Sequence, residues 1–161
     1  MSNFQEQSDS HYSNTNESSS ANGKLHQEGE ADVWFIDNDL AYRFLLRCEL
    51  ELNPIGGKLR MFDDGDRALM KLIEICTKNK AMLPKAIFTN IDTNRVGGWE
   101  LVQTLKEFEL NVDVVLFSTH PRSSDNDRML REPLVRDILV KHHDPGNIIE
   151  KMKHFASKGD C

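Results

Sequence analysis

The sequence predicts an α/β domain built on a central sheet of five parallel strands. Three observations lead to this prediction. Short apolar runs alternate with segments of helical apolar spacing, the alternation occurs five times, and polar residues follow the apolar runs abruptly. Continuous apolar runs are typical of strands buried on both faces. Strands that alternate with helices form parallel sheets with helices on both faces and right-handed crossovers.

The first strand–helix unit has the clearest pattern. An apolar run over 33–36 predicts a buried strand, which ends at the polar residues 37–39. A helix is predicted over 40–52, and Asn53-Pro54 ends it. Five apolar residues at helical spacing are expected to face the sheet: Leu40, Phe44, Leu45, Cys48 and Leu52.

The second and third units follow the same plan. A strand over 58–62 precedes a helix over 64–78. A third strand over 86–89 ends at the polar stretch 90–92, and a glycine pair separates this loop from a helix over 99–108. The apolar face of the second helix is expected to comprise Ala68, Leu69, Leu72, Ile73 and Cys76.

The last two units are shorter. A strand over 112–117 precedes a short helix over 124–131, and a strand over 138–140 follows. Pro145 suits the first turn of a helix and opens the final one, which runs to about residue 155. Residues 31–158 therefore form one predicted domain. Residues 1–30, rich in Ser, Asn, Gln, Glu and Gly, are predicted to be a disordered tail.

Functional residues are expected at the carboxyl ends of the strands. The predicted strand order is 2-1-3-4-5, the flavodoxin-like arrangement, and in open α/β sheets ligands bind where the strand order reverses. Eight polar side chains would meet in this crevice: Asp37, Asn38, Asp39, Asn90, Asp92, Ser118, Thr119 and Lys141.

This constellation resembles the CheY-like receiver domain of response regulators, from about residue 32 to 155. Residues 90–101 resemble the family's aspartate loop, and counting back from Gly98 places Asn90 at the phosphoacceptor position. The resemblance implies an acidic pair that binds magnesium after the first strand. It also implies a phosphate-contacting hydroxyl at Ser118 or Thr119 and a phosphate-contacting lysine at Lys141.

The departures from the family pattern point to a pseudo-receiver. Asn90 replaces the acceptor aspartate, and an amide lacks the anionic oxygen that attacks a phosphoryl donor. Asn38 replaces one member of the acidic pair. Because Mg²⁺ prefers charged oxygen ligands, we expect at most weak magnesium binding at Asp37, Asn38 and Asp92, and no other cofactor.

Two further departures concern switching. His142 stands where the family has a proline after its lysine, so a trans bond or a remodelled loop is expected. Ile138 replaces the family's switch aromatic residue. Lys141 keeps two interpretations, as a phosphate contact or as an ion-pair partner of Asp37 that holds the crevice together.

The expected function is that of a non-enzymatic, single-domain receiver that signals by protein–protein binding. The resemblance implies a histidine kinase, a phosphotransfer protein or another regulator as partner. It also suggests a homodimer through the fourth helix, fifth strand and fifth helix. The alternative is an active response regulator that is phosphorylated at Asp92 or binds a phosphodonor or metal without covalent transfer.

Composition argues against several other classes of protein. The net charge of −6 argues against nucleic-acid binding, and no apolar run is long enough to span a membrane. The first residues do not resemble a secretory signal. Three scattered cysteines fit reduced thiols, and we expect a cytoplasmic protein.

Overall fold

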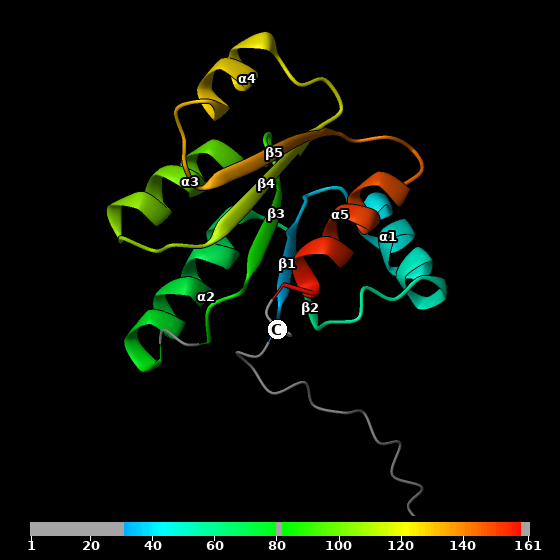
Figure 1. Ribbon diagram of the computed structural model, residues 1–161, viewed down its shortest axis with the longest axis horizontal. Coiled ribbons are helices and arrows are strands. Elements are labelled where there is room, and N and C mark those ends of the chain that lie inside the picture. The colour runs from blue at the N-terminus through cyan, green and yellow to red at the C-terminus, as the bar shows by residue number, and fades with distance from the viewer. Residues whose placement is uncertain (1–30, 80–81, 159–161) are drawn as a thin grey trace, which may run out of the picture.

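The protein is seen here as a computed structural model that describes residues 31–79 and 82–158. The predicted disordered tail, residues 1–30, lies outside the described residues. Five parallel strands form one sheet in the order β2-β1-β3-β4-β5, which confirms the flavodoxin-like prediction (Figure 1). The strands are β1 Val33–Ile36, β2 Leu59–Phe62, β3 Ala86–Asn90, β4 Asp113–Ser118 and β5 Val135–Val140. The helices are α1 Leu40–Leu52, α2 Gly65–Lys78, α3 Gly98–Glu107, α4 Ser123–Met129 and α5 Gly146–Ala156.

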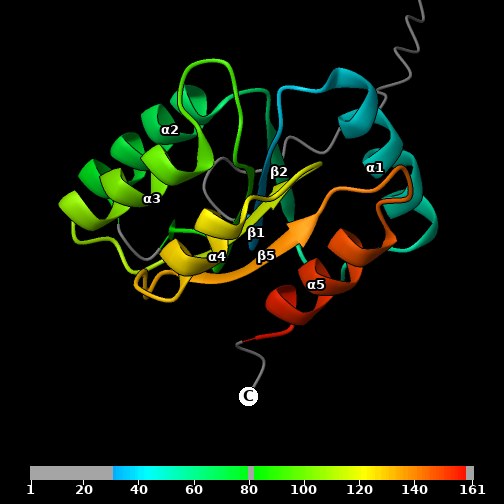
Figure 2. The same ribbon diagram turned by 90° about the horizontal axis from the view of Figure 1, so that it is seen from above.

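The sheet separates two layers of hydrophobic core. Figure 2 shows α1 and α5 on one face of the sheet and α2 and α3 on the other. Successive residues of a strand point to opposite faces, so Trp34 and Ile36 pack towards α2 and α3, whereas Phe35 packs towards α1 and α5. These three side chains are at most 1 % exposed. The central strands are therefore buried on both faces, as their continuous apolar runs predict.

The predicted apolar face of α1 is wrong. Its buried residues are Tyr42 and Leu46, whereas Leu40, Phe44 and Leu52 are more than two-thirds exposed. A series at four-residue spacing advances about 40° around the helix at each step, so it winds away from one stripe. The helix packs through Tyr42 and Leu46 against Phe35 and the α5 side of the core.

The other elements differ from expectation in smaller ways. On α2, Leu72 is buried as predicted, whereas Ile73 is 46 % exposed. The fifth strand begins three residues earlier than predicted, at Val135, and Pro145 is the N-cap of α5 rather than part of its first turn. Helix α4 buries no residue of its own.

The structure offers no membrane-spanning element in the part of the chain that it describes: none of these helices is long and apolar enough to cross a bilayer.

Candidate functional site: a crevice closed by an internal ion pair

The carboxyl ends of four strands deliver the predicted polar residues to one place. Asp37 follows β1, Asn90 ends β3, Ser118 ends β4 and Lys141 follows β5. The parallel register pairs Asn90 with Phe117 and Ser118 with Val140, so these strand ends are level with one another. The sheet therefore assembles the crevice that the sequence predicts.

An ion pair occupies the centre of the crevice. Lys141 Nζ lies 2.7 Å from Asp37 Oδ2 and 3.2 Å from Asp39 Oδ2. The side chain of Asp37 is fully buried and that of Lys141 is 7 % exposed. The ammonium also lies 4.2 Å from the centroid of the Tyr42 ring. Lys141 is therefore an ion-pair partner of Asp37 in this structure.

Asn90 is bound into the same network by its side-chain amide. Its Nδ2 donates to Asp37 Oδ1 at 3.1 Å, and its Oδ1 accepts the backbone N–H of Asp92 at 3.1 Å. Asp37 Oδ1 also accepts the backbone N–H of Asp39 at 3.1 Å. Both ends of the amide are thus engaged, and an aspartate at this position would lack the donor that Asn90 provides to Asp37.

The two hydroxyl residues at the end of β4 are turned towards His120. Ser118 is buried, and its Oγ accepts the backbone N–H of His120 at 3.2 Å. Thr119 is exposed, with Oγ1 3.1 Å from His120 Nδ1. The link between Ser118 and Lys141 is through the backbone, because the Lys141 N–H donates to the Ser118 carbonyl at 2.8 Å.

The residues expected to hold magnesium do not form a suitable donor set. Asp37 is taken by Lys141 and Asn90, and the Asn38 amide donates to Asn94 Oδ1 at 3.0 Å. Asp92 is exposed and contacts the crevice through its backbone N–H. Over residues 31–79 and 82–158, no group of three or more His, Cys, Asp or Glu side chains is arranged to hold a metal ion. Mg²⁺ requires near-octahedral oxygen ligands, so a cation at this place would have to draw Asp37 away from Lys141.

Electrostatics at the rim favour the ionised form of Asp39 and the neutral form of Tyr42. The backbone N–H of Tyr42, which donates to Asp39, and the ammonium of Lys141 hold the pKa of Asp39 below its usual value. Burial, assisted by the nearby Asp37 carboxylate, raises the pKa of Tyr42. The crevice therefore holds two carboxylates around one ammonium, which leaves one negative charge in excess.

The switching residues also differ from the family pattern in structure. The described chain contains no cis peptide bond, so the bond between Lys141 and His142 is trans, as expected. Ile138 is half-buried and packs against the core on the α2 and α3 side.

Sequence reasoning missed one buried carboxylate beside the crevice. Asp64 caps α2, is 7 % exposed and accepts backbone N–H groups of the β3–α3 loop, from Asn94, Arg95 and Val96, at 3.0 to 3.1 Å. Its position two residues after the second strand was a usable signal, since strand ends define the crevice edge. No spacing in the sequence indicates its partners, because they lie about thirty residues further along the chain.

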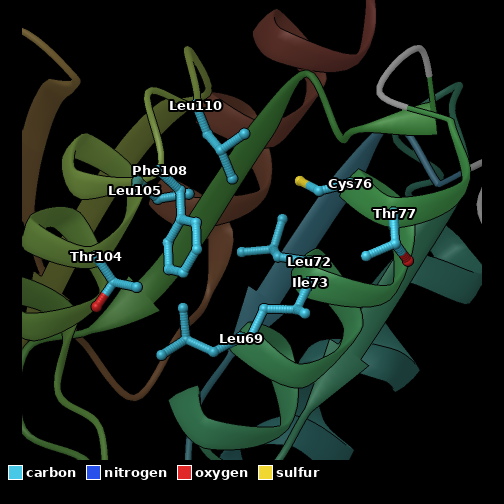
Figure 3. A pocket seen from close by; sticks show the side chains of 9 residues that line it. All are labelled: Leu69, Leu72, Ile73, Cys76, Thr77, Thr104, Leu105, Phe108 and Leu110. Atoms are coloured by element: carbon cyan, nitrogen blue, oxygen red, sulfur yellow. The ribbon is translucent and has the colours of Figure 1, made fainter.

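A separate apolar pocket lies between α2 and α3. Figure 3 shows Leu72, Leu105 and Phe108 around this cavity of about 280 Å³, with the hydroxyls of Thr77 and Thr104 turned away from it. These hydroxyls donate to backbone carbonyls of their own helices at 2.8 and 3.0 Å. None of its lining residues belongs to the crevice, so the pocket has no part in the site.

Of three comparisons with known proteins, only the one with solved structures found matches, and these agree with the fold. No family model matches the chain, and no curated protein matches it. Solved structures that resemble it include a two-component response regulator from Clostridium difficile, 19 % identical with a TM-score of 0.61, where the alignment covers 80 % of this chain and 98 % of the other. They also include the Francisella response regulator 1452 receiver domain, 16 % identical with a TM-score of 0.61 and coverages of 80 % and 98 %.

A third similar structure is a ligand complex. It is the response regulator TrrA from Thermotoga maritima in complex with Mg²⁺-BeF, 18 % identical with a TM-score of 0.58, where the alignment covers 76 % of this chain and 96 % of the other. The chain therefore has the fold of CheY-like response-regulator receiver domains. At these identities the likeness concerns the fold, and the function has to be argued from the residues of this chain.

Proposed function

We propose that the chain is a receiver-fold signalling module of a two-component system that works by protein–protein binding, without phosphorylation of an aspartate. The observation that carries the proposal is the hydrogen bond between Asn90 and Asp37 in the crevice. An amide stands at the end of β3, where the receiver family has its acceptor, and this amide donates to Asp37. An amide nitrogen in this position offers no carboxylate oxygen for an acyl phosphate.

The ion pair supports the same proposal. In an active receiver, the family resemblance implies that the lysine contacts a phosphate and the first acidic residue contacts a metal. Here the two groups neutralise each other at 2.7 Å inside the protein. A phosphoryl group or Mg²⁺ would have to displace a buried, compensated partner, which is costly in a site of low dielectric.

The rim of the crevice provides a surface for a partner. A hollow of about 580 Å³ beside the ion pair is bordered by Leu45, Val140 and His142. Of its apolar lining, Leu45 is 37 % exposed and Val140 is 42 % exposed. Exposed apolar side chains beside polar groups are typical of interaction sites. The partner under this proposal is a histidine kinase, a phosphotransfer protein or another regulator, in the cytoplasm.

Binding measurements with candidate histidine kinases and phosphotransfer proteins test this proposal. The full-length chain should bind its partner with the same Kd in the presence and absence of a small phosphodonor and Mg²⁺. Replacing two apolar rim residues, Leu45→Ser with Val140→Ser, should weaken binding at least tenfold, because buried apolar contacts dominate interface affinity. Phe108→Ser, an exposed apolar position at the end of α3, is the matched control and should leave Kd unchanged. Binding that requires the phosphodonor would refute the proposal.

A further inference from the structure

A basic groove crosses the β2 edge of the sheet. Strand β2 is an edge strand, and Figure 2 shows α1 and α2 on either side of it. The space between these two helices and β2 is a groove of about 700 Å³. Five cationic side chains line it: Arg43, Arg47, Arg60, Arg67 and Lys71. Two carboxylates, Asp63 and Glu74, also line the groove, which leaves a surplus of three positive charges.

Three arginines account for the surplus of positive charge. Arg43 donates to the backbone carbonyl of Asp37, Arg47 lies 3.9 Å from the sulfur of Met61, and Arg60 lies 5.4 Å from the centroid of the Phe62 ring. None of these three arginines is paired with a carboxylate within residues 31–79 and 82–158.

The two remaining cations of the groove are already compensated. Arg67 pairs with Asp63 at 3.2 Å, and Lys71 pairs with Glu74 at 2.8 Å. The arginines without carboxylate partners therefore come from α1 and β2, and they form the part of the groove that would attract an anion.

The chain itself carries a segment of the opposite charge. Residues 1–30 contain five acidic side chains, Glu6, Asp9, Glu17, Glu28 and Glu30, and a single lysine, which makes their net charge −4. The whole chain is acidic, with a net charge of −6, so a free polyanion such as nucleic acid is repelled at long range. A covalently attached acidic segment does not have to overcome this repulsion by diffusion, because tethering gives it a high local concentration.

The point of attachment lies near the start of the edge strand β2. The described chain begins at Ala31, and the next residue, Asp32, accepts the backbone N–H of Lys58 at 2.9 Å. Lys58 immediately precedes β2, the strand that carries Arg60. Residues 1–30 therefore join the fold next to the start of the strand that lines the groove. Glu28 is three residues before Ala31, a reach of about 10 Å in extended chain.

We propose that residues 1–30 bind in cis to the groove between α1, β2 and α2, with their carboxylates paired to Arg47 and Arg60. Each exposed ion pair contributes little by itself, so binding depends on several pairs together and is sensitive to salt.

The test uses ¹H–¹⁵N spectra of the full-length chain at about 0.01 M and about 1 M salt, where the screening length falls from roughly 30 Å to 3 Å. In the native chain, the amides of Glu28 and Glu30 and those of β2 should shift together between the two conditions. Arg47→Gln with Arg60→Gln should reduce the shift of the Glu28 and Glu30 amides by more than half. Glu28→Gln with Glu30→Gln should reduce the shift of the β2 amides in the same way.

Controls make each outcome decisive. Arg122→Gln with Arg131→Gln removes two exposed cations outside the groove and should leave the coupled shifts unchanged. Unchanged amide positions in β1 and β3 show that each variant is folded, and the acidic-residue variant tests the proposal even if the arginine variant does not fold. The proposal is overturned if Glu28 and Glu30 are insensitive to the arginine substitutions. It is also overturned if the shifts disappear on tenfold dilution, which would mean binding between copies.

Discussion

Two buried aspartates beside the same edge of the sheet are stabilised in different ways. Asp37 is fully buried, and its charge is balanced by side chains, the ammonium of Lys141 and the amide of Asn90. Asp64 is 7 % exposed and accepts four backbone N–H groups, three from the β3–α3 loop and one from Asp66. The first carboxylate depends on the choice of residues in other strands, whereas the second depends on the path of the main chain.

The two aspartates therefore have different roles: Asp37 belongs to the chemistry of the crevice, whereas Asp64 holds a loop in place. Under the proposed function, the partners of Asp37 stand in place of a receiver's acceptor and phosphate-binding lysine, so substitution there changes what the crevice can do. Asp64 holds the loop over 94–96 against the start of α2, where a Cβ on Gly65 would lie 2.2 Å from the Val96 carbonyl oxygen. Only glycine permits this close approach without a backbone shift. The loop is therefore fixed by contacts that do not involve the crevice charges.

Removal of the crevice ammonium should have the largest effect on the free energy of unfolding. Lys141→Met leaves Asp37 buried without its counter-ion and should lower the free energy of unfolding by about 3 to 4 kcal/mol. Urea unfolding at neutral pH measures the loss. Adding Asp37→Asn to Lys141→Met should restore most of it, because the uncompensated charge is gone.

A half-exposed ion pair supplies the control for this prediction. Lys151 pairs with Asp137 at 2.6 Å, and both side chains are 34 % exposed. Lys151→Met should cost less than about 1 kcal/mol. Equal losses for Lys141→Met and Lys151→Met would show that burial of the crevice pair has no energetic consequence.

Removal of the loop acceptor should have the next largest effect. Asp64→Asn replaces one carboxylate oxygen by an N–H₂ group that faces backbone donors, so buried N–H groups lose their acceptor. We expect a loss of about 2 to 3 kcal/mol in urea unfolding. Asp66→Asn, in the first turn of the same helix, changes an exposed ion pair with Arg95 and should have a much smaller effect. Similar losses at both positions would contradict the structural role given to Asp64.

Reversion of the acceptor position should have a smaller effect that depends on Mg²⁺. Asn90→Asp places a second carboxylate near Asp37, where the native amide donates at 3.1 Å. Without metal we expect a loss of about 1 kcal/mol, the equivalent of a shift of roughly one pKa unit. Millimolar Mg²⁺ should raise the thermal midpoint of the variant and leave that of the native chain unchanged. A stabilisation of the native chain by Mg²⁺ would show that Asp37 remains available as a ligand.

Protonation of Asp39 at low pH should have the smallest effect on the free energy of unfolding. The pKa of Asp39 is lowered in the folded chain, by the Tyr42 N–H and by Lys141. Its contribution to stability is therefore complete above the unfolded value of about 3.9 and is lost as the pH falls through the lower folded value. Asp39→Asn should flatten the dependence of unfolding free energy on pH below about pH 4. Identical slopes for native and variant chains would exclude this contribution.

Much of the fold could be predicted because burial leaves a direct mark on the sequence. Strands β1, β3 and β4 are continuous apolar runs, and their polar ends identify the crevice residues Asp37, Asn90 and Ser118. The face of α1 was not predictable in this way. Tyr42 is a buried residue with a hydroxyl, while Phe44 is an exposed one with none, so hydrophobicity alone selects the wrong side.

The contacts of the site were harder to predict than its position. The pairing of Lys141 with Asp37 could be proposed, because both follow strands of one sheet. The contact of Asn38 with Asn94 and the loop contacts of Asp64 could not, since they depend on how the β3–α3 loop turns. Loop geometry of this kind has no periodic signature.

The most direct test of the central claim is the intact mass of the full-length native chain after incubation with acetyl phosphate and Mg²⁺. A response regulator with an acceptor aspartate serves as the positive control under the same conditions. The native chain should keep its unmodified mass, because Asn90 has no carboxylate and Asp37 is paired with Lys141. A stable gain of one phosphoryl group that maps to Asp37, Asp39 or Asp92 would contradict the claim.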